Sequence, residues 1–147
     1  MRIEAKNNWI DLRGIERSRT YYFKDRPPIV VIDPLELFVR LNDAHSLLCT
    51  DNQIIEIPET WYAFTADGDF GVSVAETGGV DSRWEEVDPV VEALDFHITA
   101  ETIFRVRKPV KTMIRSSESV KIQQSDNRIA YIRKGWRYVT PLIKPDI

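Results

Sequence analysis

The chain has 147 residues, of which 43% are hydrophobic, and a formal net charge of −3 at pH 7. This length and apolar content suit one compact domain, residues 1–147, and exclude two large ones. The N-terminus lacks the apolar run of a signal peptide and no later stretch is apolar enough to span a bilayer, so we expect a cytoplasmic protein without a membrane partner. The single cysteine, Cys49, lies in an apolar run that predicts a buried side chain.

Short runs rich in β-branched and aromatic residues, bounded by Asp, Asn, Gly or Pro, predict an all-β sandwich or barrel. In the first half of the chain the predicted strands are 20–23, 29–32, 35–41, 46–49, 53–57, 61–65 and 70–75. In the second half they are 90–97, 102–106, 110–115, 119–123, 128–132 and 136–140. Turn sequences are predicted at 26–28, 33–34, 66–69, 77–79, 108–109 and 125–127.

The segment 85–95 is open to two interpretations. The spacing of its apolar residues favours a short helix, whereas Pro89 favours a loop followed by a strand.

Charge is distributed unevenly along the chain. Residues 1–104 contain 9 Lys and Arg against 20 Asp and Glu, and residues 105–147 contain 11 against 3, which gives −11 and +8. We therefore expect a basic C-terminal arm from about residue 116, which can meet phosphates, nucleic acid or an acidic protein face. Solvated strand faces that balance an acidic front half are the alternative.

A glycine pair precedes an acid and an aromatic residue in the segment Thr77-Gly78-Gly79-Val80-Asp81-Ser82-Arg83-Trp84. The glycines allow the backbone to approach a ligand closely, and an acid at such a bend can face a pocket. The same pattern is also typical of an ordinary hairpin turn.

Several short elements resemble those of dCTP deaminases and trimeric dUTPases, and they occur in the same order. Asp11-Leu12-Arg13-Gly14 is similar to the early Asp-Leu-Arg-Leu-Gly element, and residues 47–58 are similar to the apolar strand that closes in Val-x-Ile-Pro. Residues 79–84 resemble the Ile-Asp-Pro-Gly-Trp turn of the deaminases and the Gly-Val-Ile-Asp-Ser-x-Tyr turn of the dUTPases. Leu94-Asp95-Phe96 resembles the closing Leu-Glu-Phe strand.

The resemblance implies a distorted β-barrel or jelly-roll that assembles as a homotrimer and binds a small deoxynucleotide. In such a site Asp81 would orient or deprotonate a water molecule, Glu92 or Asp95 would be the second acid, and Trp84 would pack beside the sugar or base. The other nucleotide-binding candidates are Gly79, Arg83, Arg133 and Arg137. Mg²⁺ would bind through the nucleotide phosphates.

The chain departs from this family between Pro58 and Gly79. There the family places the serine and arginine that hold phosphate and position water, but this interval contains no arginine. The added acids Asp67 and Asp69 would repel a triphosphate. The sequence therefore allows an active hydrolase or a catalytically inactive nucleotide-binding protein. The alternative is a non-enzymatic trimeric β-scaffold that binds a macromolecule or sequesters a nucleotide.

The sequence lacks the residues that several other classes of enzyme require. One cysteine cannot supply a zinc deaminase site, so no zinc or other protein-held metal is expected. A phosphate-binding glycine loop, a dinucleotide fingerprint and a serine-hydrolase elbow are missing from the sequence. Residues 131–138 alternate aromatic and basic side chains, which can bind nucleic acid, although we favour an intersubunit arm.

Overall fold

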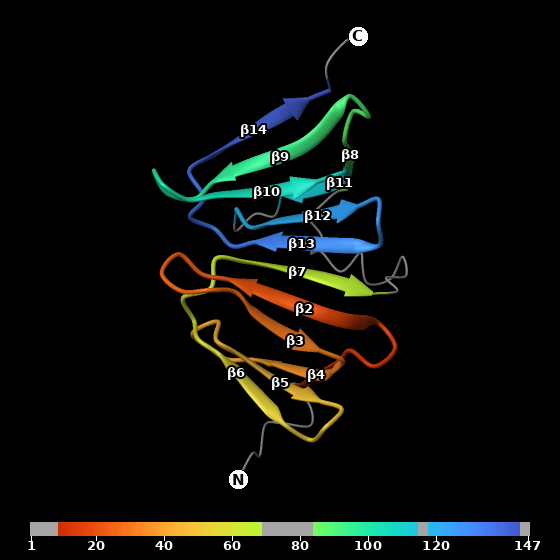
Figure 1. Cartoon of the computed structure of the whole chain (residues 1–147), viewed down its shortest axis with the longest axis vertical. Coiled ribbons are helices and arrows are strands. Elements are labelled where there is room, and N and C mark those ends of the chain that lie inside the picture. Colours follow the sequence, from red (N-terminus) through yellow and green to blue (C-terminus); the bar gives the residue numbers. More distant parts are fainter. Residues whose placement is uncertain (1–8, 69–83, 115–117, 145–147) are drawn as a thin grey trace. The chain divides into compact units, whose positions relative to one another are not determined.

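The computed structural model describes residues 9–68, 84–114 and 118–144 (Figure 1). Within these ranges every regular element is a β-strand, and neighbouring strands run antiparallel, so the predicted all-β class is confirmed. The same ranges contain no helix long and apolar enough to cross a membrane. The chain divides into two compact units, Met1–Asp69 and Phe70–Ile147. The expectation of one domain over residues 1–147 depends on how these two units are joined, and it stays a prediction.

The N-terminal unit contains two groups of hydrogen-bonded strands, in the orders β1-β4-β5-β6 and β3-β2-β7. Their bounds are β1 (Trp9–Asp11), β2 (Glu16–Tyr22), β3 (Ile29–Ile32), β4 (Pro34–Val39), β5 (His45–Cys49), β6 (Ile54–Ile57) and β7 (Ala63–Gly68). Side chains from both groups form one core, which includes the fully buried Val31 and Leu47. Cys49 is also buried, as predicted, and burial raises the pKa of its thiol.

A chain of buried polar groups runs through this core. Arg19 donates to both carboxylate oxygens of Glu16, at 2.9 and 2.6 Å, and to the Tyr21 hydroxyl at 3.0 Å. Because Arg19 can only donate, the Tyr21 hydroxyl hydrogen is available to its other partner, Nδ1 of His45. The guanidinium carbon lies 4.0 Å from the centre of the Phe64 ring. These contacts replace the water that a buried charge loses, and the pKa of Arg19 is raised accordingly.

A bulge in β2 makes this ion pair possible. Residues three apart on a regular strand point to opposite faces, yet Glu16 and Arg19 are both buried. The register between β2 and β7 shifts between Glu16 and Ser18, which turns Glu16 to the same side as Arg19. Gly68 of β7 lies opposite Glu16, and a Cβ atom there would approach the Ile15 carbonyl oxygen to 1.9 Å. Only glycine therefore fits at this position.

The turn predicted at 66–69 is wrong for residues 66–68, which belong to β7. The Asp67-Gly68 pair is typical of a hairpin, but here the glycine is required by the close approach of Ile15. The strand predicted at 70–75 and the turn predicted at 77–79 lie outside the described residues.

The C-terminal unit also contains two groups of antiparallel strands, in the orders β10-β9-β14 and β13-β12-β11-β8. Their bounds are β8 (Glu85–Glu86), β9 (Val91–His97), β10 (Ile103–Arg107), β11 (Pro109–Ile114), β12 (Val120–Gln124), β13 (Arg128–Ile132) and β14 (Tyr138–Ile143). The core of the unit includes Phe104, Val106 and Met113. Trp136 packs edge to face on Phe96, with 5.4 Å between the ring centres.

The ambiguous segment 85–95 contains the short strand β8, a loop and the start of β9, and no helix. Asp88 starts a turn in which its side chain accepts from the Val90 N–H and its carbonyl accepts from the Val91 N–H. Pro89 occupies the middle of this turn, where its missing N–H has no cost.

We expect the substitution Arg19→Met to lower the free energy of unfolding by about 3–5 kcal/mol, because it leaves the Glu16 carboxylate buried without a counter-charge. Urea denaturation measures this change. The control is Arg17→Gln on the same strand, whose side chain is 61% exposed and whose loss should cost less than about 0.5 kcal/mol. Equal effects of the two substitutions would contradict a structural role for the buried pair.

Candidate functional site

A pocket of about 410 Å³ lies at one end of the C-terminal unit, where strands begin or end. Glu92 comes from the start of β9, Lys108 from the turn between β10 and β11, Ser125 from the turn after β12, and Lys144 from the residue after β14. Val91 adds apolar surface. This volume lies within the range of about 300–1,000 Å³ that is usual for small-molecule sites.

Backbone hydrogen bonds hold these segments together. The Lys108 N–H donates to the Glu92 carbonyl and the Ser125 N–H donates to the Lys108 carbonyl, both at 3.0 Å. The Lys144 N–H donates to the Val90 carbonyl at 2.9 Å. Lys108 has a φ of 52°, a left-handed turn conformation. The lining residues are therefore fixed by the ends of the sheets.

Two lysines line the pocket. Lys108 and Lys144 are both exposed, and no carboxylate in the described ranges forms an ion pair with either of them. Lysine is a flexible point charge that suits phosphate, and the Ser125 hydroxyl can donate to an anion as well. Glu92 is the acid of the same pocket. The arrangement can hold an anion beside a carboxylate that can accept a proton or a hydrogen bond.

Asp95, the other candidate for the second acid, lies in different surroundings. It accepts from Arg105 Nε at 2.7 Å and from Arg105 Nη2 at 2.8 Å, a bidentate ion pair across β9 and β10. The hydrogen bond from Arg105 lowers the pKa of Asp95. The carboxylate is therefore kept ionised, which does not suit a proton donor near neutral pH.

The remaining predicted residues are spread over the unit or lie outside the described ranges. Trp84 precedes β8, and its indole N–H is buried without an acceptor among the described residues. Arg133 follows β13, and the backbone N–H of Arg137 donates to His97. Those outside the described ranges are Gly79, Asp81 and Arg83. Of the predicted residues within these ranges, Glu92 is the one that lines the pocket.

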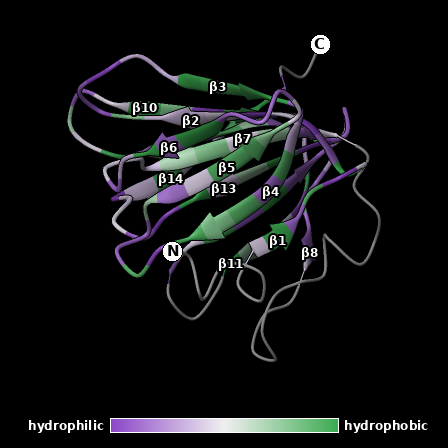
Figure 2. Ribbon diagram, turned by 90° about the horizontal axis from the view of Figure 1, so that it is seen from below, coloured by the Kyte–Doolittle hydropathy of each residue, from purple (hydrophilic) through white to green (hydrophobic). Residues whose placement is uncertain are grey.

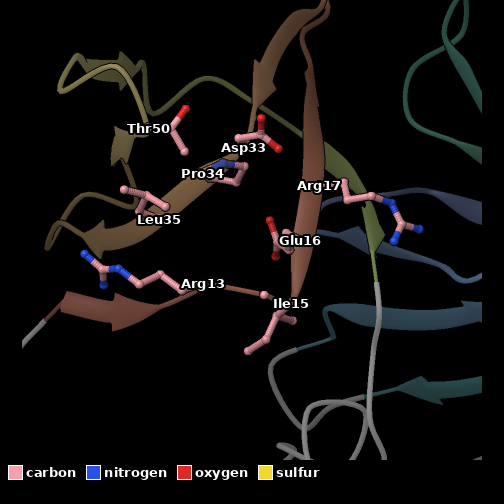
Figure 3. A pocket seen from close by; sticks show the side chains of 9 residues that line it. Arg13, Ile15, Glu16, Arg17, Asp33, Pro34, Leu35 and Thr50 are labelled. Atoms are coloured by element: carbon pink, nitrogen blue, oxygen red, sulfur yellow. The ribbon is translucent and has the colours of Figure 1, made fainter.

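A second cavity, of about 250 Å³, lies in the N-terminal unit beside the Asp11-Leu12-Arg13-Gly14 turn (Figure 3). Figure 3 shows the Arg13 and Arg17 side chains extending away from it on opposite sides. Each is paired with an acid, Arg13 with Glu36 at 2.9 Å and Arg17 with Asp67 at 3.3 Å. This cavity therefore offers an anion no unpaired guanidinium, and the motif serves as a turn.

In the part of the chain that the structure describes, no group of three His, Cys, Asp or Glu side chains is placed to hold a metal ion. The expected Mg²⁺ would be held mainly by phosphate oxygens and its own water molecules. That expectation needs no cage of protein ligands, and it stays a prediction.

Sequence reasoning missed Lys108, Ser125 and Lys144 as site residues. Two of them belong to turns that were predicted at 108–109 and 125–127, so the signal for their exposure was present in the sequence. Their convergence depends on which strand ends are neighbours in the sheets. No local pattern carries that information.

Comparison with known proteins gives no relative: no family model, no curated protein and no solved structure matches this chain. The likeness to dCTP deaminases and dUTPases therefore depends on the short sequence elements alone.

The Asp95–Arg105 pair predicts a pH-dependent contribution to stability. We expect Arg105→Gln to lower the free energy of unfolding slightly at pH 7, because the arginine is 41% exposed and solvent weakens the pair. The pair lowers the pKa of the Asp95 carboxyl in the folded state, so it stabilises the fold at pH values above the pKa of the unfolded state, which is near 3.8. This stabilisation is lost as the pH falls through the pKa of the folded state. The cost should therefore shrink below about pH 4, measured by urea denaturation from pH 7 to pH 2. It should be near zero at every pH in an Asp95→Asn background. A cost that stays constant down to pH 2 would rule out this account.

Proposed function

We propose that the protein binds a small nucleotide, with its phosphates between Lys108 and Lys144. The observation that carries this proposal is the pocket in which two lysines and Ser125 surround a space large enough for a ligand, beside Glu92. Phosphate oxygens would satisfy both ammonium groups, and the adjacent apolar surface would receive a sugar or a base.

The proposed class is a divergent dCTP deaminase- or dUTPase-like protein of deoxynucleotide metabolism with a jelly-roll fold. The ordered sequence elements and the antiparallel all-β structure support it. The acidic segment that follows Trp84 also reaches the pocket, because the Val87 N–H donates to the carbonyl of Val110, a lining residue. In the active form of this proposal Asp81 activates a water molecule, Glu92 is the second acid, and Mg²⁺ bound to the phosphates neutralises part of their charge.

We expect dUTP or dCTP to raise the melting temperature of the protein, and the double substitution Lys108→Gln/Lys144→Gln to weaken the affinity at least about tenfold, since each charged hydrogen bond contributes roughly 1.5–3 kcal/mol. Thermal-shift titration with dUTP, dCTP and tripolyphosphate measures both effects. The matched control is Lys24→Gln, which removes an exposed lysine of the N-terminal unit that does not line the pocket.

A wild-type protein that no nucleotide stabilises, or a double variant that is stabilised equally, would overturn the proposal. Glu92→Gln separates binding from catalysis. It should abolish release of dUMP, pyrophosphate or ammonia in the presence of Mg²⁺ while nucleotide binding is retained. Binding without turnover by the wild-type protein identifies the catalytically inactive form of the proposal.

We further propose that the chain assembles as a homotrimer through strand β3. This strand lies at the edge of its sheet, and Figure 2 shows it coloured as hydrophobic. Val31 is buried, while Val30 and Ile32 on the opposite face are 56% and 59% exposed. Adjacent β-branched side chains on an exposed edge strand are typical of a surface that another subunit covers.

Sedimentation equilibrium should give three times the 17.1 kDa mass of one chain. Val30→Lys/Ile32→Lys should give the monomer mass, because two charges would be buried at the contact. The control, Ile114→Lys, changes a side chain of β11 that is 61% exposed and should leave the trimer intact. A monomeric wild-type protein would rule out the assembly.

A further inference from the structure

We propose that the outer face of the β10-β9-β14 sheet binds single-stranded nucleic acid. The outer face consists of the side chains that point away from the core of the C-terminal unit. Strand β10 defines it, because Phe104 and Val106 are buried whereas Ile103, Arg105 and Arg107 are exposed. This face lies beside the lysine pocket, but the proposal depends on other side chains.

The strand register arranges the outer face in three rows across the sheet. Each row takes one residue from β10, one from β9 and one from β14. The rows are Ile103, His97 and Tyr138; then Arg105, Asp95 and Thr140; then Arg107, the fully buried Ala93, and Leu142.

The first row forms a stacking platform. The rings of His97 and Tyr138 lie parallel, with 4.1 Å between their centres and 14° between their planes. Thr140 holds His97 by a hydrogen bond to Nε2 at 3.0 Å. Tyr138 is 50% exposed on an edge strand, so the ring has a face that no described aromatic residue covers. A nucleobase can continue this stack.

The other two rows carry a net charge of +1, that of Arg107, and contain no unpaired acid. Asp95 is neutralised by its bidentate contact with Arg105. Arg107 is exposed and forms no ion pair with the described acids. The backbone of Arg137 enters the sheet beside the platform, through its hydrogen bond to His97. An unpaired guanidinium and an exposed aromatic ring on one face can bind phosphates and unpaired bases together.

The length of the face favours an oligonucleotide over a mononucleotide. Tyr138 and Leu142, in the first and last rows, are four residues apart along β14, which corresponds to about 13 Å at roughly 3.3 Å per residue. Stacked nucleotides rise about 3.4 Å each, so about four of them cover this distance.

The edge of β14 does not favour another protein strand as the occupant. Pro141 lies in the middle of β14 and has no N–H to donate to an added strand. Aromatic stacking and phosphate contacts require no such ladder, so Pro141 is compatible with a nucleic acid on this face.

The test is fluorescence anisotropy with labelled dT12 and rU12 at 50–200 mM salt. Unlabelled dT2, dT4, dT6 and dT8 serve as competitors. We expect affinity to rise with length up to about four nucleotides. Tyr138→Ala should weaken binding about tenfold or more, whereas Tyr138→Phe, which keeps the ring, should retain it. Arg107→Gln should weaken binding and reduce the salt dependence by about one counterion. Lys24→Gln is again the matched control.

Failure to bind either oligonucleotide at 50 mM salt would overturn the proposal, as would tighter binding of duplex DNA or unchanged affinity after Tyr138→Ala. Tyr138→Ala should not alter the melting-temperature shift caused by dUTP or dCTP. Loss of nucleotide binding and loss of oligonucleotide binding are therefore measured separately.

Discussion

The buried ion pair between Glu16 and Arg19 is the constraint on which the N-terminal unit depends. Two charges taken from water stabilise a fold only when their partners are complete, and here both carboxylate oxygens accept from one guanidinium. The pair requires the bulge in β2, and the bulge requires Gly68 in the neighbouring strand. A slip of one residue between β2 and β7 would turn Arg19 out of the core and leave Glu16 without its partner. The pair therefore fixes the register of this sheet.

The C-terminal unit is specified differently, by apolar alternation and by turns. Its buried side chains follow the two-residue period of β10, and Asp88 and Lys108 set the turns that bring strand ends together. Side chains at those ends do not contribute to the core. They are free to carry charge, and for this reason the lysine pocket forms where the sheets end instead of across the middle of a strand.

Local patterns in the sequence predict most strands of this fold. Residues 29–32 and 128–132 are short runs rich in β-branched or aromatic residues between clear turn signals, and both predicted strands have the bounds that the structure shows. Short strands without flanking signals, β1 and β8, were missed because pairing with a distant strand defines them. The site was harder to predict. Glu92 and Asp95 are three residues apart on β9, so the strand period predicts that they lie on opposite faces. That one lines a pocket and the other forms an ion pair depends on neighbours that are distant in the sequence.

The ion pair between Asp95 and Arg105 connects the two proposed activities of the C-terminal unit. It holds the Asp95 carboxylate on Arg105, whereas Glu92 is the acid that lines the pocket. It also cancels the negative charge in the middle row of the outer face, between the Tyr138 platform and the basic end of the sheet. An unpaired carboxylate there would repel a phosphate chain that crosses the face. The pair thus lies between the proposed nucleotide pocket and the proposed nucleic-acid surface, and β9 contributes to both.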